Sequence, residues 1–163
     1  QLTGVANRIL LYDRLQHAMA LAARDLKMVA VFFIDLDGYK EINDQFGHLV
    51  GDKLLVQIAN RLKKNLRESD TIARFGGDEF ILILENIVDH KSVRPIAEKI
   101  RNTITQPYQI DNHECLITAS FGISVYPNDG TTAEELINKA DTAMYSIKDL
   151  GKNHYKFANN IFN

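Results

Sequence analysis

Apolar positions along this chain follow two different periods, and the alternation between them outlines a fold. Apolar residues recur with the spacing of an amphipathic helix in residues 6–24, 38–46, 50–66, 91–105 and 132–149. Between these segments, short apolar and β-branched runs predict strands at residues 29–34, 71–75, 80–84, 108–110, 116–125 and 154–157. Because helices and strands are interleaved, we expect an α+β fold with a central, mostly antiparallel mixed sheet of about five strands flanked by helices.

Composition places the chain among ordinary globular domains and excludes several classes of protein. The 163 residues, of which 45% are apolar and 25% charged, suit a single hydrophobic core. No repeat or linker divides residues 1–163, so we expect one domain. A net charge of −2 gives no reason to expect a nucleic-acid polymer as a partner. Without a signal peptide or a membrane-length apolar run, we expect a cytoplasmic domain that makes no membrane contact of its own.

The cysteine and histidine content argues against a disulfide framework and against a zinc site. Cys115 is the single cysteine, which excludes an internal disulfide and fits a reducing compartment. Its apolar neighbours predict a strand, so we expect a buried and unreactive thiol. The five histidines are scattered without the spacing of zinc ligands, and we expect surface or locally bonded side chains for all of them.

Residues 74–80, Arg-Phe-Gly-Gly-Asp-Glu-Phe, are the most informative stretch of the chain. Gly76 and Gly77 predict a tight reversal, because glycine supplies the positive φ values of a two-residue hairpin turn. Asp78 and Glu79 follow at once, at the tip of the predicted hairpin, where their charges repel each other. A metal ion would neutralise these carboxylates. The tip therefore indicates a metal and phosphate site carried on a sheet.

A second group of candidate residues follows the first buried strand. Asp35 closes that strand, and it can converge with Asp78 if the strand lies beside the hairpin. Carboxylates fixed on rigid elements are what metal-assisted phosphoryl transfer requires. The short helix that begins near Gly38 offers free N–H groups to phosphate, and Lys40 adds a positive charge in its first turn. We expect Asp37 to be the N-cap of this helix and not a member of the site.

These motifs together resemble the GGDEF family, the diguanylate cyclases that condense two GTP molecules into cyclic di-GMP. The resemblance extends in order, and with matching spacing, over residues 2–8, 33–44, 46–52, 76–80, 119–124, 140–145 and 151–153. It implies a nucleotide-cyclase-like fold with a ferredoxin-like core and with the Gly-Gly-Asp-Glu-Phe motif on a β-hairpin. It also implies a homodimer, since each subunit would bind one GTP and supply half of the chemistry.

The resemblance implies a Mg²⁺ site, with Mn²⁺ as a substitute, and names its ligands. Asp35 and Asp78 correspond to the side-chain ligands, and Leu36 contributes its backbone carbonyl. Glu79 corresponds to a second catalytic carboxylate near the metals. The implied catalytic residues are therefore Asp78, Glu79 and Asp35, and the sequence leaves open which of them acts as the general base.

The resemblance also implies the residues that bind substrate. These are Gly38, Tyr39, Lys40, Asn43, Asp52, Gly76, Gly77, Lys148 and Lys152. Asn43 and Asp52 would read guanine, whose N–H donors and carbonyl suit an amide and a carboxylate. Adenine would leave these groups unpaired, so the site should reject it. Lys152 stands where the family usually has arginine, which keeps the charge but loses the bidentate fork.

Residues 67–70, Arg-Glu-Ser-Asp, stand five residues before Gly76 and resemble the family's product-inhibition motif. Arg67 would grip a phosphate or the Hoogsteen edge of guanine, and Asp70 would accept guanine N–H groups. Lys99 stands where the family often has a further arginine. The alternative is a local salt bridge between Arg67 and Asp70 that contributes little to stability.

Three other functions remain open from the sequence. The domain could bind GTP or cyclic di-GMP and regulate a neighbouring domain, it could be a structural or dimerisation domain, or it could cyclise a single ATP or GTP. We also expect the chain to be part of a longer regulatory protein with a sensor upstream. Residues 155–163 loosely resemble the stretch that leads into a phosphodiesterase domain in tandem proteins.

Overall fold

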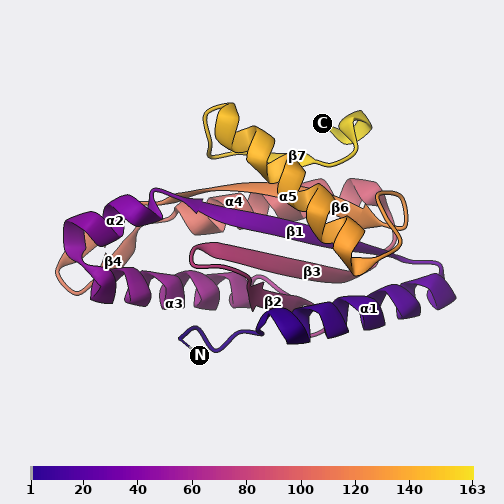
Figure 1. The fold of residues 1–163 in the computed structure, drawn as a ribbon, viewed down its shortest axis with the longest axis horizontal. Helices are drawn as coiled ribbons and strands as arrows, with labels where there is room; N and C mark the ends of the chain where they lie inside the picture. Colours follow the sequence, from indigo (N-terminus) through magenta and orange to yellow (C-terminus); the bar gives the residue numbers. More distant parts are fainter. Residues whose placement is uncertain (1) are drawn as a thin grey trace.

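A five-stranded sheet with the strand order β2-β3-β1-β6-β7 runs through the middle of the molecule (Figure 1). The computed structural model describes residues 2–163. The strands of this sheet are β1 (Met28–Asp37), β2 (Thr71–Arg74), β3 (Glu79–Ile87), β6 (Thr118–Tyr126) and β7 (Tyr155–Phe157). All neighbouring pairs are antiparallel except β6 and β7, which are parallel. The predicted mixed and mostly antiparallel sheet is therefore confirmed.

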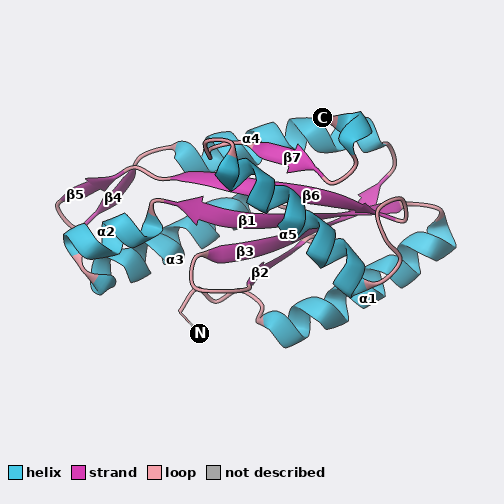
Figure 2. Ribbon diagram, turned by 45° about the horizontal axis from the view of Figure 1, so that its top comes forward, coloured by secondary structure: helices cyan, strands magenta, loops and turns pink. Residues whose placement is uncertain are grey.

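Helices cover both faces of the sheet (Figures 1 and 2). They are α1 (Arg8–Asp25), α2 (Tyr39–Phe46), α3 (His48–Lys64), α4 (Val93–Thr105) and α5 (Ala133–Asp149). Buried residues of α1 and α5 pack on one face, and those of α3 and α4 pack on the other. The chain is thus an α+β domain with helices on each side of the sheet, as the sequence predicted. In the described residues, no helix combines the length and the hydropathy that crossing a membrane requires.

The central strand β1 explains the uninterrupted apolar run in the sequence. Val29, Val31 and Phe33 belong to the core beneath α1 and α5, whereas Ala30 and Phe32 belong to the core beneath α3 and α4. A strand covered on both faces needs apolar residues at every position. Because side chains alternate along a strand, the aspartates two and four residues after Phe33 return to the face that α5 covers.

The segment between α4 and β6 differs from the prediction. The sequence predicted one strand over residues 116–125 after the strand at residues 108–110. In the structure, β4 (Tyr108–Ile110) pairs with an unpredicted strand, β5 (His113–Cys115), in a separate two-stranded sheet, and β6 begins at Thr118. Leu116 is 64% exposed, because the chain leaves the small hairpin there before it joins the main sheet as β6. Cys115 is buried and unpaired with another cysteine, which confirms the predicted buried thiol.

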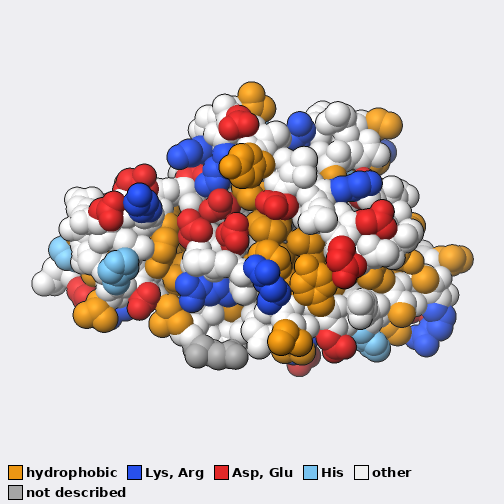
Figure 3. All heavy atoms as spheres, in the orientation of Figure 1, with side chains coloured by type: hydrophobic (Ala, Val, Ile, Leu, Met, Phe, Trp, Pro, Cys, Tyr) orange, Lys and Arg blue, Asp and Glu red, His pale blue; other side chains and the backbone are white. Residues whose placement is uncertain are grey.

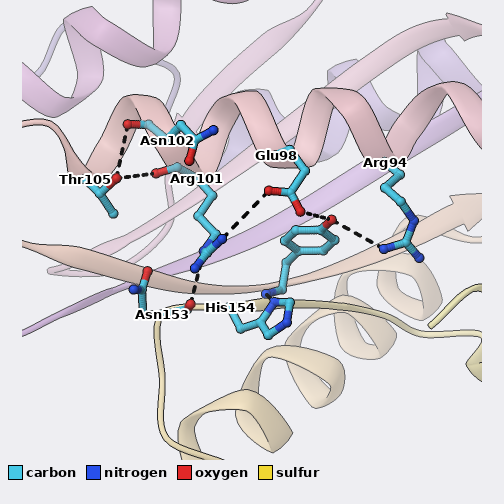
Figure 4. A network of polar contacts seen from close by, with 8 residues as sticks. Arg94, Glu98, Arg101, Asn102, Thr105, Asn153 and His154 are labelled. Atoms are coloured by element: carbon cyan, nitrogen blue, oxygen red, sulfur yellow. Dashed lines mark hydrogen bonds and ion pairs between the residues drawn. The ribbon is translucent and has the colours of Figure 1, made fainter.

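A polar network attaches α4 to the segment that follows α5 (Figure 4). The Tyr155 hydroxyl donates to Glu98 Oε1 at 2.7 Å, and Arg101 Nε donates to the Asn153 carbonyl at 3.1 Å. Arg101 also lies 3.8 Å from Glu98. The network fixes the turn between α5 and β7. This support matters because β7 is a three-residue edge strand that pairs only with β6.

We predict that Gly122→Ala will strongly destabilise the domain. A Cβ atom at Gly122 would lie 2.0 Å from the Ala140 carbonyl oxygen and 2.6 Å from Met144 N, both in the backbone of α5. Backbone atoms cannot turn aside, so α5 would have to lift from β6, and we expect the free energy of unfolding to fall by about 3 kcal/mol. Urea denaturation measures this change.

Gly77→Ala is the matched control, because nothing lies within 4 Å of a Cβ atom built at Gly77. We expect this variant to unfold within about 0.5 kcal/mol of the wild type, as is usual for exposed sites. Equal stability of the Gly122→Ala variant and the wild type would contradict the close packing of α5 on β6.

Candidate active site

Three carboxylates meet where β1 and β3 lie side by side. Asp35 near the end of β1 stands opposite Glu79, the first residue of β3, in the antiparallel register. Asp78 precedes Glu79 in the loop, and its carbonyl accepts a hydrogen bond from Leu36 N at 3.1 Å. The structure therefore places the end of β1 beside the hairpin, as the sequence led us to expect. On the face of the molecule that Figure 3 shows, acidic side chains gather near the middle, with Lys and Arg side chains above and below them.

Burial and mutual repulsion change the acidity of these groups. Burial raises the pKa of Asp35 to about 7, and the neighbouring charge of Asp78 adds to the increase, while Lys148 opposes it. Burial also raises the pKa of Glu79, again with a contribution from Asp78. Carboxyl groups that are costly to ionise favour a nearby cation and are typical of functional sites.

The glycine loop does not have the conformation that the sequence suggested. Neither Gly76 nor Gly77 adopts a positive φ, so the two-residue hairpin turn is wrong. The connection spans residues 75–78, and the amides of Phe75 and Gly76 both point to the Glu79 carbonyl, at 2.8 and 3.5 Å. A Cβ atom at Gly76 would lie 2.3 Å from Glu79 Oε1, whereas Gly77 faces open space. The glycines therefore make room for the Glu79 carboxylate and leave the loop accessible.

Two arginines that the sequence did not assign to the site brace this loop. Arg74 donates from Nη2 to the Gly77 carbonyl at 2.8 Å, and Arg8 donates to the Phe75 carbonyl at 3.3 Å. The Arg8 guanidinium also lies 3.8 Å from the centroid of the Phe75 ring. The position of Arg74 next to the glycines was a usable signal. Arg8 and Phe75 lie 67 positions apart in the sequence. The resemblance of residues 2–8 to the family marked this segment but did not indicate that Arg8 contacts the loop.

Gly38 links β1 to α2 in a conformation that favours glycine. Its φ is 85°, and it is the N-cap residue of α2. Tyr39 and Lys40 form the first turn of this helix, where backbone N–H groups have no partner within the helix. Such a helix start suits a phosphate group. The structure therefore places the three predicted phosphate-binding residues together, next to Asp35.

Asp37 is not the N-cap that we expected. Its buried carboxylate accepts hydrogen bonds from the hydroxyls of Thr118 and Ser120, both at 2.8 Å, and from Asn153 N at 3.1 Å. Lys148 donates to Asp37 Oδ1 at 2.6 Å. Burial acts to raise the pKa of this carboxyl, but these hydrogen bonds outweigh it and hold the pKa below its ordinary value. The backbone turns at Gly38, so α2 needs no side-chain cap, and Asp37 faces β6 and α5 instead.

The two predicted phosphate-binding lysines lie at the C-terminal end of α5. Lys148 bonds to Asp37 and lies 3.6 Å from Asp35 Oδ2. Lys152 is exposed in the turn that follows α5. A helix C-terminus favours cations, and the carboxylates of β1 add to this preference. Lys148 therefore belongs to the acidic cluster, and Lys152 stands at its margin.

The predicted guanine readers lie on α2 and α3. The side chain of Asn43 covers Gly51, where an added Cβ would be 1.8 Å from Asn43 Oδ1. This oxygen is buried and has no hydrogen-bond partner among the described residues. Burial raises the pKa of the Tyr39 hydroxyl; a hydrogen bond with the Asn43 side chain opposes the increase, and the charge of Asp52 adds to it. An unpartnered buried acceptor beside a carboxylate suits a base that offers N–H donors.

The residues present also suit magnesium. In residues 2–163, no group of three or more His, Cys, Asp or Glu side chains is arranged so that it could hold a metal ion. Magnesium usually takes only one or two carboxylates and completes its octahedral shell with waters and phosphate oxygens. Asp35, Asp78 and the Leu36 carbonyl are hard oxygen donors of this kind; Asp35 and Leu36 lie on β1, and Asp78 lies in the loop directly before β3.

The three residues of the predicted inhibitory site line one cleft of about 170 Å³ between α3, β3 and α4. The Asp70 side chain is only 4% exposed. Its oxygens accept from Arg67 N at 2.9 Å and from Glu85 N at 3.1 Å. The side chain of Arg67 and that of Lys99 are exposed. Asp70 therefore holds the local backbone. It also pairs with Arg67 Nε at 3.5 Å, which is the local salt bridge that the sequence left as the alternative. The Arg67 guanidinium donates to the Glu85 carbonyl as well, so a ligand that reaches Arg67 and Lys99 meets an arginine that already has partners.

Comparison with known proteins identifies one family. The family described as "Diguanylate cyclase, GGDEF domain" matches residues 1–154. The bifunctional diguanylate cyclase/cyclic di-GMP phosphodiesterase MucR of Pseudomonas aeruginosa is 49% identical over 162 residues, which are 99% of this chain and 24% of MucR. The chain thus spans about a quarter of the length of that relative.

Solved structures agree with this result. The GGDEF domain of TpbB from Pseudomonas aeruginosa is similar with a TM-score of 0.94 and 36% identity, covering 98% of this chain and 94% of that one. The GGDEF domain of DgcB from Caulobacter crescentus, in complex with cyclic di-GMP, is similar with a TM-score of 0.86 and 28% identity. The match covers 97% of this chain and 94% of the DgcB domain.

We predict that Asp35→Asn will change how stability depends on pH. The pKa of Asp35 is about 7 in the folded chain, above the value of about 3.9 in an unfolded one. The folded protein therefore holds a proton that the unfolded chain releases, and wild-type stability falls as the pH rises through this window. Asparagine removes that dependence, so relative to the wild type the variant should gain about 2 kcal/mol between pH 5 and pH 8.

Urea denaturation at a series of pH values measures the effect. Asp25→Asn, at the exposed end of α1, controls for the loss of a carboxylate elsewhere. A constant difference between wild type and Asp35→Asn across this range would show that Asp35 does not carry the raised pKa.

Proposed function

Because this chain belongs to the family of diguanylate cyclase GGDEF domains, we propose that it condenses two GTP into cyclic di-GMP and two pyrophosphates. The observation that carries the proposal is the cluster of Asp35, Asp78 and Glu79 beside the start of α2. Acids in this arrangement, next to a phosphate-binding helix start, suit a nucleotide with bound divalent metal. A structural domain would have no use for such a cluster, and the residues of the site are intact.

Asp35 and Asp78, with the Leu36 carbonyl, would hold Mg²⁺, and Mn²⁺ would fit the same oxygen donors. When bound, the ion supplies charge neutralisation on the phosphates and makes the ribose hydroxyl more acidic. Asp78 or Glu79 would take the proton of the 3′-hydroxyl, and the raised pKa that burial gives Glu79 makes it a better base than an exposed carboxylate. The 3′-oxygen of one GTP then attacks the α-phosphorus of the other, and pyrophosphate leaves.

The remaining residues hold the substrate in line for this attack. The backbone of Gly38 and Tyr39 and the ammonium group of Lys40 would bind phosphates at the start of α2. Gly76 and Gly77 leave the loop open to substrate. Lys148 at the end of α5 and Lys152 in the turn after it would meet the terminal phosphates. Catalysis of this kind relies on positioning and on fixed charges rather than on a covalent intermediate.

Guanine specificity would come from Asn43 and Asp52. The orphaned Asn43 Oδ1 would accept an N–H of the base, and the Asp52 carboxylate would accept another. Adenine lacks the matching pattern of donors and would leave these groups unpaired, at a large cost in binding. This argument disfavours a cyclase that acts on ATP.

The reaction needs two copies of this chain. One chain offers one guanine site and one set of carboxylates, whereas the product joins two guanosine units through two symmetric phosphodiester bonds. Two domains must therefore face each other, each with one GTP. A homodimer in the cytoplasm, where GTP is present, satisfies this requirement.

The direct test is product formation. Purified protein with GTP and Mg²⁺ should yield cyclic di-GMP and pyrophosphate, and Asp78→Ala should reduce the rate at least about a thousandfold, as expected for removal of a metal-binding carboxylate. Chromatography with mass detection identifies the product. Asp25→Ala on α1 is the control and should keep wild-type activity.

Binding of GTP without turnover, at protein concentrations high enough to form dimers, would contradict the enzyme and would favour a nucleotide-binding module that regulates a neighbouring domain. A cyclic mononucleotide as the only product would instead indicate a cyclase that acts on a single nucleotide.

We also propose that cyclic di-GMP inhibits the enzyme by binding at Arg67, Asp70 and Lys99. The cleft that these residues line supports this proposal, as does the similarity to the DgcB domain with bound cyclic di-GMP. Arg67→Ala should raise the concentration of product needed for half inhibition about tenfold, because a charge-assisted hydrogen bond is lost. The uninhibited rate should stay unchanged.

Arg67 is the appropriate residue for this test. Asp70 binds two backbone N–H groups from a buried position, so its substitution would disturb the fold, whereas the exposed Arg67 side chain gives up only a bond to the Glu85 carbonyl and its pair with Asp70. Arg24→Ala, on the exposed end of α1, is the matched control. Equal inhibition of wild type and Arg67→Ala in a rate assay with added cyclic di-GMP would place inhibition elsewhere.

A further inference from the structure

Lys148 lies between two carboxylates at unequal distances. Its Nζ is 2.6 Å from Asp37 Oδ1 and 3.6 Å from Asp35 Oδ2. A hydrogen bond from nitrogen to oxygen reaches about 3.2 Å, so Lys148 is bonded to Asp37 and only near Asp35. The side chains of Lys148 and Asp35 are each about a fifth exposed, at 20% and 21%, which leaves their charges little screened by water.

Asp37 is held in place independently of Lys148. The hydroxyls of Thr118 and Ser120 bind its two oxygens from β6, and Asn153 N binds one of them from the turn after α5. That turn is fixed in its own right, because Arg101 on α4 donates to the Asn153 carbonyl (Figure 4). The carboxylate is therefore an anchor that stays in position whatever the lysine contacts.

The geometry of β1 makes the two aspartates competitors for this lysine. Asp35 and Asp37 are two residues apart on one strand, so both face α5. Without Asp37, the nearest carboxylate to Lys148 is Asp35, and a small change of lysine rotamer closes the 3.6 Å gap. A direct bond would occupy an oxygen of Asp35 and cancel its charge, which are the two properties that a divalent cation needs.

We propose that Asp37 is a positioning residue that holds Lys148 away from Asp35 and so keeps the Asp35 carboxylate available to a divalent cation. The inference rests on the proposed role of Asp35 as a metal ligand. Asp37 itself touches neither the cation nor the substrate. It acts through Lys148, which remains close enough to meet the phosphates of a bound nucleotide.

The experiment is a double-mutant cycle read out by metal binding. Mn²⁺ is titrated into wild type, Asp37→Asn, Lys148→Met and the double variant, and free Mn²⁺ is measured by electron paramagnetic resonance. Asp37→Asn should weaken Mn²⁺ binding about tenfold, the usual size of the effect for a residue that orients a metal ligand. In the Lys148→Met background most of that loss should disappear, because no lysine remains to close onto Asp35.

Asp129→Asn is the matched control. Asp129 is as buried as Asp37, each being 7% exposed, and it binds the backbone N–H of Val125 at 2.7 Å near the other end of β6. This variant should lose stability but bind Mn²⁺ like the wild type. Equal Mn²⁺ affinity of wild type and Asp37→Asn would overturn the proposal. The same loss in both lysine backgrounds would also overturn it, because that result indicates a direct effect of charge on the cation.

A milder variant covers the case in which Asp37→Asn fails to fold. Thr118→Val keeps the charge of Asp37 but removes one of the bonds that anchor it. It should weaken Mn²⁺ binding in the wild-type background and have little effect beside Lys148→Met. Unchanged Mn²⁺ binding by folded Thr118→Val, when Asp37→Asn does not fold, would count against the anchoring role.

The cyclase assay on the same proteins separates this inference from the proposed function. Active wild type together with unaltered Mn²⁺ binding by Asp37→Asn would overturn the positioning role alone. Wild type that shows the predicted cycle of Mn²⁺ affinities but forms no cyclic di-GMP would overturn the proposed reaction alone. Wild type that binds no Mn²⁺ would overturn both.

Discussion

The charges at the end of β1 are the constraint around which this domain is organised. A strand that is buried on both faces carries carboxylates at Asp35 and Asp37, close to the core, where an ionised group is stable only with partners. Asp37 receives two hydroxyls, one backbone N–H and Lys148. Asp35 has only a lysine at 3.6 Å, and burial together with the charges of Asp78, Glu79 and Asp37 raises its pKa to about 7. Asp37 thus has the hydrogen bonds of a structural aspartate, whereas Asp35 has the unmet charge that we propose a divalent cation would neutralise.

The surrounding strands and loop hold the carboxylates near Asp35 in fixed positions. The β1–β3 register sets Asp35 opposite Glu79, and the bond from Leu36 N to the Asp78 carbonyl ties the loop to the same strand. Arg74 and Arg8 hold the loop by its carbonyls, so the repelling carboxylates cannot separate by moving the backbone. Relief must then come from a proton or a cation. Fixed carboxylates that cannot relax are the preorganised environment in which phosphoryl transfer is accelerated.

The sequence predicted those features that depend on local pattern. The continuous apolar run of β1, the short helix over residues 38–46 and the buried Cys115 all follow from periodicity and from single residues. It could not predict the partners of Asp37, which lie 81 to 116 positions away and belong to elements whose register only the folded sheet defines. The predicted conformation of the glycine loop was wrong for a related reason. Paired glycines suggest a positive φ, but at Gly76 the decisive contact is with the side chain of Glu79.

Other aspartates with buried side chains have hydrogen-bond donors, so the lack of donors at Asp35 is specific to its position. Asp70 holds the backbone N–H groups of Arg67 and Glu85, and Asp129 holds that of Val125. The fold thus supplies donors to a buried carboxylate when a carboxylate has a structural role. Among the described residues, no hydrogen-bond donor reaches the side chain of Asp35 within 3.5 Å, although hydroxyls on β6 lie close enough to serve its neighbour Asp37. The sheet thus supplies hydrogen bonds to Asp37 but leaves Asp35 with only a lysine at 3.6 Å. A carboxylate without donors of its own is what the binding of a cation requires.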